Sequence, residues 1–121
     1  MAVSSLEVSI ATEVSGPVLV LAGETDVTSI PRLDETLAAQ ISGQAVQLTI
    51  DAANLRYADS ASMRTLVMAA MKVRNRAGSV TLLDPQPPVA RMLDLLCVDE
   101  MFSIRRRAAG ETHPDTSADG G

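Results

Sequence analysis

The sequence predicts an α/β fold, in which a mixed and mainly parallel β-sheet has helices packed on it. Two short segments rich in aliphatic and β-branched residues, at 45–51 and 79–83, are typical of strands, and apolar residues recur at helical spacing between them, at about 60–77. Two strands that are joined through a helix pair in parallel, with a right-handed crossover. The order strand–helix–strand therefore predicts the parallel part of the sheet.

The N-terminal segment predicts the antiparallel part. Apolar and polar residues alternate at 6–11, residues 18–21 are apolar throughout, and Ser15-Gly16-Pro17 between them is a turn signal. We expect these two runs to pair as a hairpin at one side of the sheet.

The first helix is expected to begin near Pro31. Proline is favoured in the first turn of a helix, and the acidic Asp34 and Glu35 complement the helix dipole there. Gly43 is expected to end the helix. The residues expected on its buried face are Ile30, Leu33, Leu37 and Ile41.

The second helix, at about 60–77, is expected to end at Gly78 as its C-cap. The residues expected on its buried face are Met63, Leu66, Val67, Ala70 and Met71. Met71 is therefore predicted to lie in the core, and a carboxylate in its place is predicted to destabilise the fold strongly.

The remaining segments predict a third helix that Pro87-Pro88 opens and a last, edge strand at 101–104. From residue 108 onward the sequence has no apolar periodicity. We therefore predict one domain at 1–107 and a disordered tail at 108–121.

The composition indicates a globular domain that does not bind nucleic acid. The 121 residues carry a formal net charge of −5, whereas a protein that binds nucleic acid presents a basic surface to the phosphates. Only 2% of the residues are aromatic, so the core is expected to be aliphatic. Cys97 is the only cysteine and lies in the apolar run 95–98, so we expect a buried thiol in a reducing compartment.

The sequence also predicts a cytoplasmic, soluble protein without direct membrane insertion. Its N-terminus lacks the pattern of a signal peptide, and no run reaches the roughly 18 apolar residues of a membrane-spanning helix. No nucleophile–base arrangement, metal-ligand spacing or glycine-rich phosphate loop is found, and His113 falls in the predicted tail. We expect no enzymatic activity, no cofactor and no bound metal.

The segment from Tyr57 to Met63, which joins a predicted strand to the second helix, is the most informative part of the sequence. Asp59 or Ser60 is expected to be the N-cap, because either side chain can accept a hydrogen bond from a free N–H of the first turn. A phosphate on Ser60 would be favoured by the same N–H groups and by the helix dipole.

Two motifs in this chain resemble the STAS domain, the fold of bacterial anti-sigma factor antagonists. Asp59-Ser60-Ala61-Ser62-Met63 is similar to the family's Asp-Ser-Ser-Gly-Leu or Asp-Ser-Ala-Gly-Leu motif, with serine in place of glycine and methionine in place of leucine. Gly23-Glu24-Thr25-Asp26-Val27-Thr28-Ser29 is similar to the family's Gly-Glu-Leu-Asp followed by Thr-Ala. The resemblance covers about residues 6–106.

The resemblance implies a single STAS-like domain in which Ser60 is the serine that a partner kinase phosphorylates, with Ser62 as a rival phosphoacceptor. The residues implied to bind the partner are Asp26, Asp59, Ser60, Ser62 and Met63. The implied function is that of an anti-sigma factor antagonist. Such a protein–protein switch binds an anti-sigma factor, typically a serine protein kinase, when it is dephosphorylated, and so releases a sigma factor.

Two other functions stay open at this point. The chain could be the non-catalytic STAS subunit of a membrane lipid transporter, in which the serine motif needs no phosphorylation. It could also be a STAS domain that senses a small ligand such as a nucleotide.

Overall fold

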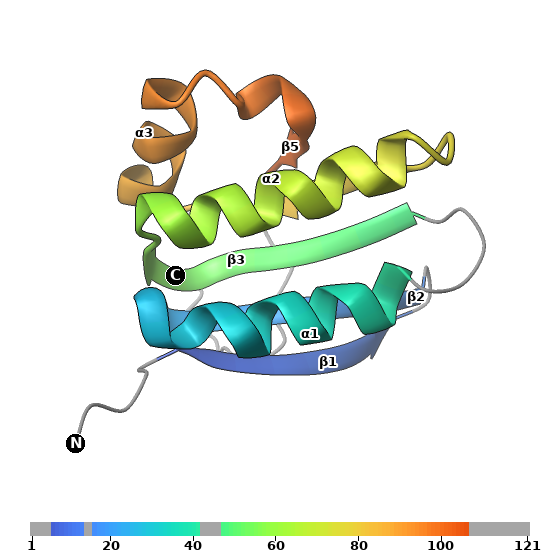
Figure 1. Cartoon of the computed structure of the whole chain (residues 1–121), viewed down its shortest axis with the longest axis horizontal. Helices are drawn as coiled ribbons and strands as arrows, with labels where there is room; N and C mark the ends of the chain where they lie inside the picture. The colour runs from blue at the N-terminus through green and yellow to red at the C-terminus, as the bar shows by residue number, and fades with distance from the viewer. Residues whose placement is uncertain (1–5, 14–15, 42–46, 107–121) are drawn as a thin grey trace.

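The computed structural model describes residues 6–13, 16–41 and 47–106, and it confirms the predicted α/β fold with a mixed, mainly parallel sheet (Figure 1). The five strands are β1 (Glu7–Glu13), β2 (Gly16–Glu24), β3 (Gln47–Tyr57), β4 (Ser79–Leu83) and β5 (Ser103–Arg105). They lie in the order in which they occur in the chain. β1 pairs with β2 in antiparallel orientation, and the other neighbouring pairs are parallel. The predicted tail at 108–121 and the predicted helix stop at Gly43 lie outside the described residues.

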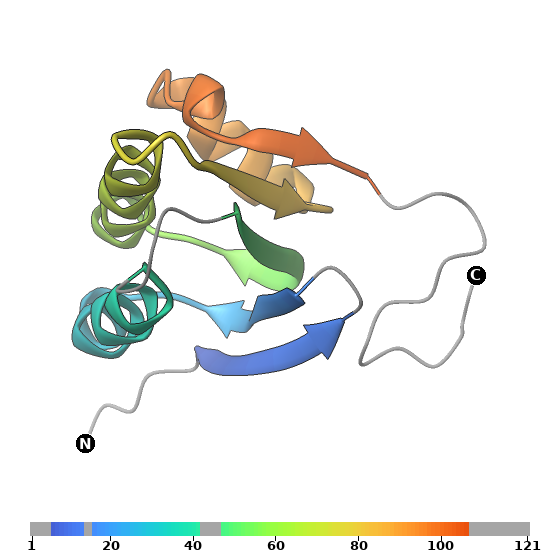
Figure 2. The same ribbon diagram turned by 90° about the vertical axis from the view of Figure 1, so that its right-hand side faces the viewer.

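The helices lie on one face of the sheet because each right-handed crossover leads to the next strand in the same direction. They are α1 (Ile30–Ile41), α2 (Ser60–Arg74) and α3 (Pro87–Leu95), and two short 3-10 helices, η1 (Val27–Ser29) and η2 (Asp99–Met101), accompany α1 and α3. Figure 2 shows α1 and α2 side by side on this face. The amino ends of both helices therefore lie at the carboxyl edge of the parallel strands.

The core fills the space between this face of the sheet and the helices, and it is almost entirely aliphatic, as predicted. Its largest fully buried members are Leu19, Leu21, Leu33, Leu37, Ile50, Leu55, Met63, Leu66, Leu82 and Leu93. Phe102 is the one aromatic residue in this cluster, whereas Tyr57 is exposed.

β3 continues beyond the run at 45–51 that predicted it and reaches Tyr57. Its register against β2 shifts between the pair Val20–Asp51 and the pair Ala22–Asn54. The buried Asp51 carboxylate accepts a hydrogen bond from the Ala53 N–H at 3.0 Å, so it satisfies a backbone donor within the irregular stretch. The extension brings the end of β3 level with the end of β2.

The prediction that Met71 lies in the core is wrong, since its side chain is 48% exposed. The buried residues of α2 are Ser62, Met63, Leu66, Ala69, Ala70 and Val73. The helix is turned relative to the predicted phase because it packs against α1 as well as the sheet, and the small side chain of Ala69 faces α1. Apolar spacing alone does not distinguish these two orientations.

The prediction that Cys97 is buried is also wrong. Cys97 follows α3 in the left-handed conformation, with φ of 57°, and its side chain is exposed. Its N–H donates to the carbonyl of Asp94, and the N–H of Val98 donates to the carbonyl of Leu93, both at 3.0 Å. These two bonds form a Schellman motif, which satisfies the last carbonyls of the helix and turns Cys97 outward.

α2 ends in the same way, and it ends earlier than predicted. The helix stops at Arg74, and the left-handed residue is Ala77, with φ of 63°, rather than the predicted cap Gly78. The N–H of Ala77 donates to the carbonyl of Arg74, and the N–H of Gly78 donates to the carbonyl of Val73. A residue with a Cβ atom therefore holds the strained position of this motif.

The burial of α2 predicts opposite outcomes for two adjacent substitutions. Ala70→Asp places an unpaired carboxylate in the core and is expected to lower the free energy of unfolding by roughly 3 kcal/mol or more. Met71→Asp adds the same charge at the surface and is expected to change it by less than about 1 kcal/mol. Urea denaturation of both variants measures the difference, and equal losses would contradict the orientation of α2 described above.

The left-handed Ala77 predicts a stabilising substitution. Ala77→Gly removes the Cβ clash and is expected to raise the free energy of unfolding by about 1 kcal/mol. Ala38→Gly, at an exposed position inside α1, is the control and is expected to lower it by roughly 0.5–1 kcal/mol. The melting temperatures of the two variants should move in opposite directions, and a fall for both would argue against the Schellman geometry.

Candidate functional site

The two sequence motifs lie side by side at the carboxyl edge of β2 and β3. Glu24 and Tyr57, the last residues of these strands, are register partners. Just beyond them, the N–H of Thr25 donates to the carbonyl of Tyr57 at 3.1 Å. The segments that follow lead into η1 and α2, whose amino ends lie at the same end of the sheet (Figure 1).

A pair of hydrogen bonds between Thr25 and Asp59 joins the two motifs. The buried Thr25 hydroxyl donates to Oδ1 of Asp59 at 2.5 Å and accepts from the N–H of Asp59 at 2.8 Å. Thr25 is a site residue that the predicted set does not contain. A signal was present nonetheless, because Thr25 is a polar residue at the place where the resembling motif has an apolar leucine.

These contacts hold Asp59 in its charged form. Partial burial alone would raise the pKa of this carboxyl, but the hydroxyl groups of Ser62 and Thr25 and the backbone N–H groups of Ser62 and Asp59 stabilise the carboxylate. The net effect is a pKa below the usual value for aspartate. Asp59 is therefore a fixed negative charge beside Ser60 at neutral pH.

Asp26 caps the entrance to α1. Its Oδ1 accepts hydrogen bonds from the N–H of Thr28 at 2.9 Å and from the Thr28 hydroxyl at 2.5 Å. In return, the Ser29 hydroxyl accepts from the N–H of Asp26 at 2.8 Å, which completes a capping box. The side chain of Asp26 remains exposed at the surface.

Ser60 is the first residue of α2, and Asp59 is the N-cap, one of the two alternatives that the sequence left open. The carbonyl of Asp59 accepts from the N–H of Met63 at 2.9 Å, which closes the first turn. The Asp59 carboxylate lies toward Thr25 and makes no side-chain cap hydrogen bond of standard geometry. Ser60 is exposed, and its hydroxyl makes no hydrogen bond to another residue in the described part of the chain.

Ser62 and Met63, the other two predicted site residues, are fully buried. The Ser62 hydroxyl lies 3.5 Å from the carbonyl oxygen of Asp26, so α2 packs closely against the segment before α1 at this point. In this conformation a kinase could not reach the Ser62 hydroxyl. The structure thus brings the five predicted residues into one region, with Asp26, Asp59 and Ser60 at its surface.

A largely apolar groove begins at Ser60 and runs between α2 and the segment after α3. Its volume is about 510 Å³. The residues that line it are Ser60, Ala61, Arg64, Val67, Leu96 and Val98. The neighbouring Leu95 is also strongly exposed, so apolar surface continues beyond the groove.

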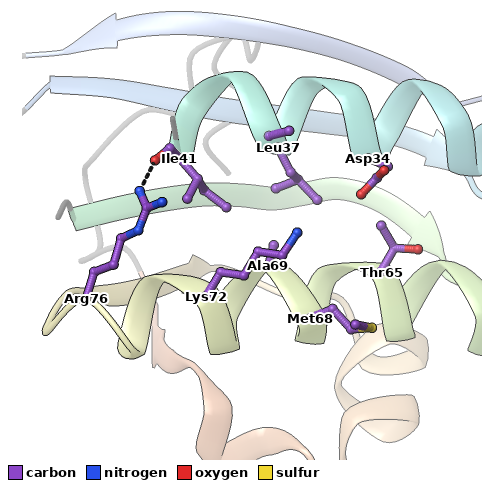
Figure 3. A pocket seen from close by; sticks show the side chains of 9 residues that line it. Asp34, Leu37, Ile41, Thr65, Met68, Ala69, Lys72 and Arg76 are labelled. Atoms are coloured by element: carbon purple, nitrogen blue, oxygen red, sulfur yellow. Dashed lines mark hydrogen bonds between the residues drawn. The ribbon is translucent and has the colours of Figure 1, made fainter. Parts of the chain in front are cut away.

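A second groove, of about 250 Å³, lies between α1 and α2 (Figure 3). Asp34, Leu37 and Ile41 line it from α1, and Lys72 and Arg76 line it from α2 and the turn that follows. Arg76 donates to the carbonyl of Ile41 at 2.7 Å and so ties the two helices together. None of the five predicted site residues lines this groove.

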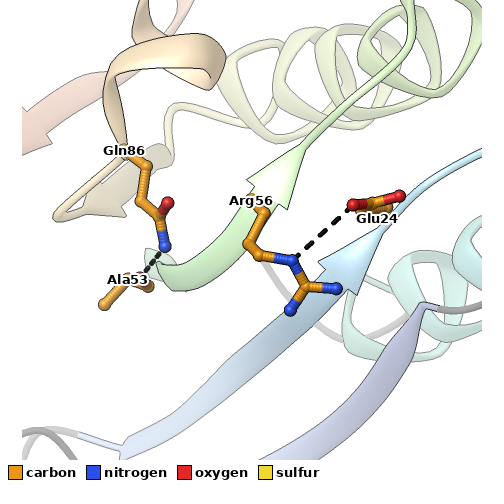
Figure 4. A network of polar contacts seen from close by, with 4 residues as sticks. All are labelled: Glu24, Ala53, Arg56 and Gln86. Carbon is orange, nitrogen blue, oxygen red and sulfur yellow. Dashed lines mark hydrogen bonds and ion pairs between the residues drawn. The ribbon is translucent and has the colours of Figure 1, made fainter.

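Two further polar contacts support the carboxyl edge of the sheet (Figure 4). Gln86, just before α3, donates to the carbonyl of Ala53 at 2.6 Å and fixes the start of that helix against β3. Arg56 and Glu24 form an ion pair at 3.6 Å, but both side chains are largely exposed. An exposed ion pair contributes at most about 1 kcal/mol, so the buried contacts dominate here.

Within the described residues, no three histidine, cysteine or acidic side chains are grouped so that they could hold a metal ion. In the same part of the chain, no helix has both the length and the apolar character needed to cross a membrane.

The architecture is that of anti-sigma factor antagonists of known structure. An anti-sigma factor antagonist from Mycobacterium paratuberculosis superimposes with a TM-score of 0.73 at 20% identity, covering 84% of this chain and 86% of that one. The antagonist SpoIIAA in its unphosphorylated form gives 0.71 at 16% identity, covering 84% and 89%. A STAS domain protein from Planctomyces limnophilus gives 0.70 at 18% identity, covering 84% and 90%. At these identities the likeness establishes the fold.

The sequence itself identifies the family. Residues 8–105 match the family model described as "Mlab, STAS domain", and this chain belongs to the STAS domain family. A comparison with curated protein sequences found no significant match.

The Thr25–Asp59 contact predicts a defined loss of stability. Thr25→Val keeps the shape of the side chain but leaves the Asp59 N–H unpaired, so the free energy of unfolding should fall by about 1–3 kcal/mol. Thr28→Val is the control. It removes one exposed hydroxyl contact and is expected to cost less than about 0.5 kcal/mol.

The same contact predicts how the loss depends on pH. The pKa of Asp59 is lower in the folded protein than in the unfolded chain. The Asp59 carboxylate therefore contributes fully to the free energy of unfolding above the unfolded pKa of about 3.9, and this contribution is lost as the pH falls through the folded pKa. The difference in stability between the native chain and Thr25→Val should therefore shrink on acidification below about pH 4. A difference that stayed constant would contradict the charged form of Asp59 as its source.

Proposed function

We propose that this protein is an anti-sigma factor antagonist, a non-catalytic switch that binds an anti-sigma factor when Ser60 is unmodified and releases it when a serine protein kinase phosphorylates Ser60. The anti-sigma factor would be occupied by the unmodified form, and a sigma factor would be free to act. The proposed switch requires neither nucleic acid nor a cofactor.

The observation that carries the proposal is the position of Ser60. It is the exposed serine of the motif, it begins α2, and it lies directly beside a carboxylate that stays charged. A phosphate adds a charge of about −1.5 to −2 at neutral pH, and the amino end of a helix accommodates it without unfolding. The principal change would be at the surface, where a partner that docks on Ser60 would meet two adjacent negative groups.

The non-catalytic subunit of a lipid transporter is the second candidate, and the burial of Ser62 favours it. In this chain a buried serine, packed beneath the segment before α1, occupies the place where the switch motif has glycine. A subunit that needs no phosphorylation tolerates such a change in the motif. A constitutive subunit would bind its partner regardless of charge at Ser60.

The test uses mass spectrometry and calorimetry with the serine kinase and anti-sigma factor encoded nearest to this chain's gene. Phosphate is expected on Ser60 in the native chain and absent in Ser60→Ala, which should bind as the native chain does. Ser60→Asp is expected to bind about tenfold more weakly or worse, equivalent to ~1.4 kcal/mol. Ser103→Asp, at an exposed position in β5, adds the same charge elsewhere and should bind normally.

Two results would overturn the proposal. Phosphate on Ser62 alone would transfer the switch to a residue that must first become exposed. Absence of phosphate, combined with unchanged binding by Ser60→Asp, would favour the constitutive subunit.

A further inference from the structure

Arg64 is the charged residue closest along α2 to Ser60 on the same side of the helix. It follows Ser60 by four residues, and both line the same apolar groove. Of the six residues that line this groove, Arg64 alone carries a charge.

The Arg64 side chain is exposed and makes no hydrogen bond or ion pair with another described residue. Four other arginines each donate to a backbone carbonyl, namely Arg32, Arg74, Arg76 and Arg106. The Arg64 guanidinium is therefore available to bind a new group.

The spacing of the two residues suits an ion pair across one helical turn. Side chains at positions i and i+4 are neighbours on a helix, and an acidic group that precedes the cation is the more favourable order. A guanidinium also binds a phosphate through two parallel N–H donors, which a lysine cannot do. A phosphate on Ser60 would have Asp59 on one side, which repels it, and Arg64 on the other, which attracts it.

We propose that Arg64 is the intramolecular partner of a phosphate on Ser60, and that the resulting pair covers the end of the groove that Val67, Leu96 and Val98 line. This inference rests on the proposed modification of Ser60 and adds a second effect to its charge. Without phosphate, the apolar walls are open to a partner's side chain. With phosphate, the ion pair lies across them, and an apolar group would have to displace or desolvate it.

The test places phosphoserine at position 60 during translation, so that no kinase is needed. The second pKa of a phosphoserine is about 6, and ³¹P NMR follows it as the pH is changed. Arg64→Gln is expected to raise this pKa by about 0.3 unit or more, the shift that corresponds to the loss of an i,i+4 ion pair. Arg64→Lys should restore part of the shift.

Lys72→Gln is the matched control for charge. Lys72 is an exposed cation of the same helix, 12 residues from Ser60 and so about 18 Å along the axis, beyond the screening length in physiological salt. Its removal should leave the phosphate pKa unchanged. An equal shift in both variants would mean that net charge, and not the Arg64 contact, sets the pKa.

A second measurement reports on the groove. The methyl resonances of Val67, Leu96 and Val98 should shift on phosphorylation of the native chain and shift much less in Arg64→Gln. Equal pKa values and equal methyl shifts in the two chains would overturn the inference. That result would leave the switch at Ser60 intact if Ser60→Asp still weakened partner binding, whereas failure of the kinase to modify Ser60 would count against the proposed function alone.

Discussion

Thr25 holds the two halves of the site together because one hydroxyl group serves as both donor and acceptor toward the same residue. A buried hydroxyl must be paired, and Asp59 provides both partners through its carboxylate and its N–H. The start of α2 is thereby fixed against the end of β2, although 34 residues separate them in the chain. Because Ser60 directly follows Asp59, this contact also fixes the position of Ser60 at the surface.

The surrounding contacts make the site a preformed surface. Asp26 and Ser29 close the capping box at the start of η1, and the buried Ser62 hydroxyl lies beneath the same segment. Each of these polar groups has a partner nearby, so the residues around Ser60 are already ordered before any modification of Ser60. Ser62 also explains how the chain fills the space that glycine leaves empty in the resembling motif: its side chain points inward and joins the two loops.

Local signals were enough to predict the hairpin and the parallel strands, because turn residues and apolar periodicity depend on a few neighbouring residues. The predictions are wrong where contacts with elements that are distant in the chain determine the structure. The phase of α2 depends on α1 as well as the sheet, so Ala69 is buried and Met71 is not. Cys97 lies in an apolar run, yet the end of α3 needs a left-handed residue there. The role of Thr25 depends on a partner in another motif, which spacing along the chain does not reveal.

The outward position of Cys97 makes the molecule easy to observe. It is the only cysteine of the chain, its side chain is exposed, and its two neighbours in sequence, Leu96 and Val98, both line the groove beside Ser60. A fluorophore or spin label attached to this thiol would sit at the rim of that groove without any added mutation. Its emission or mobility would respond when a side chain, a phosphate or a partner enters the groove, so the native chain carries its own reporter position.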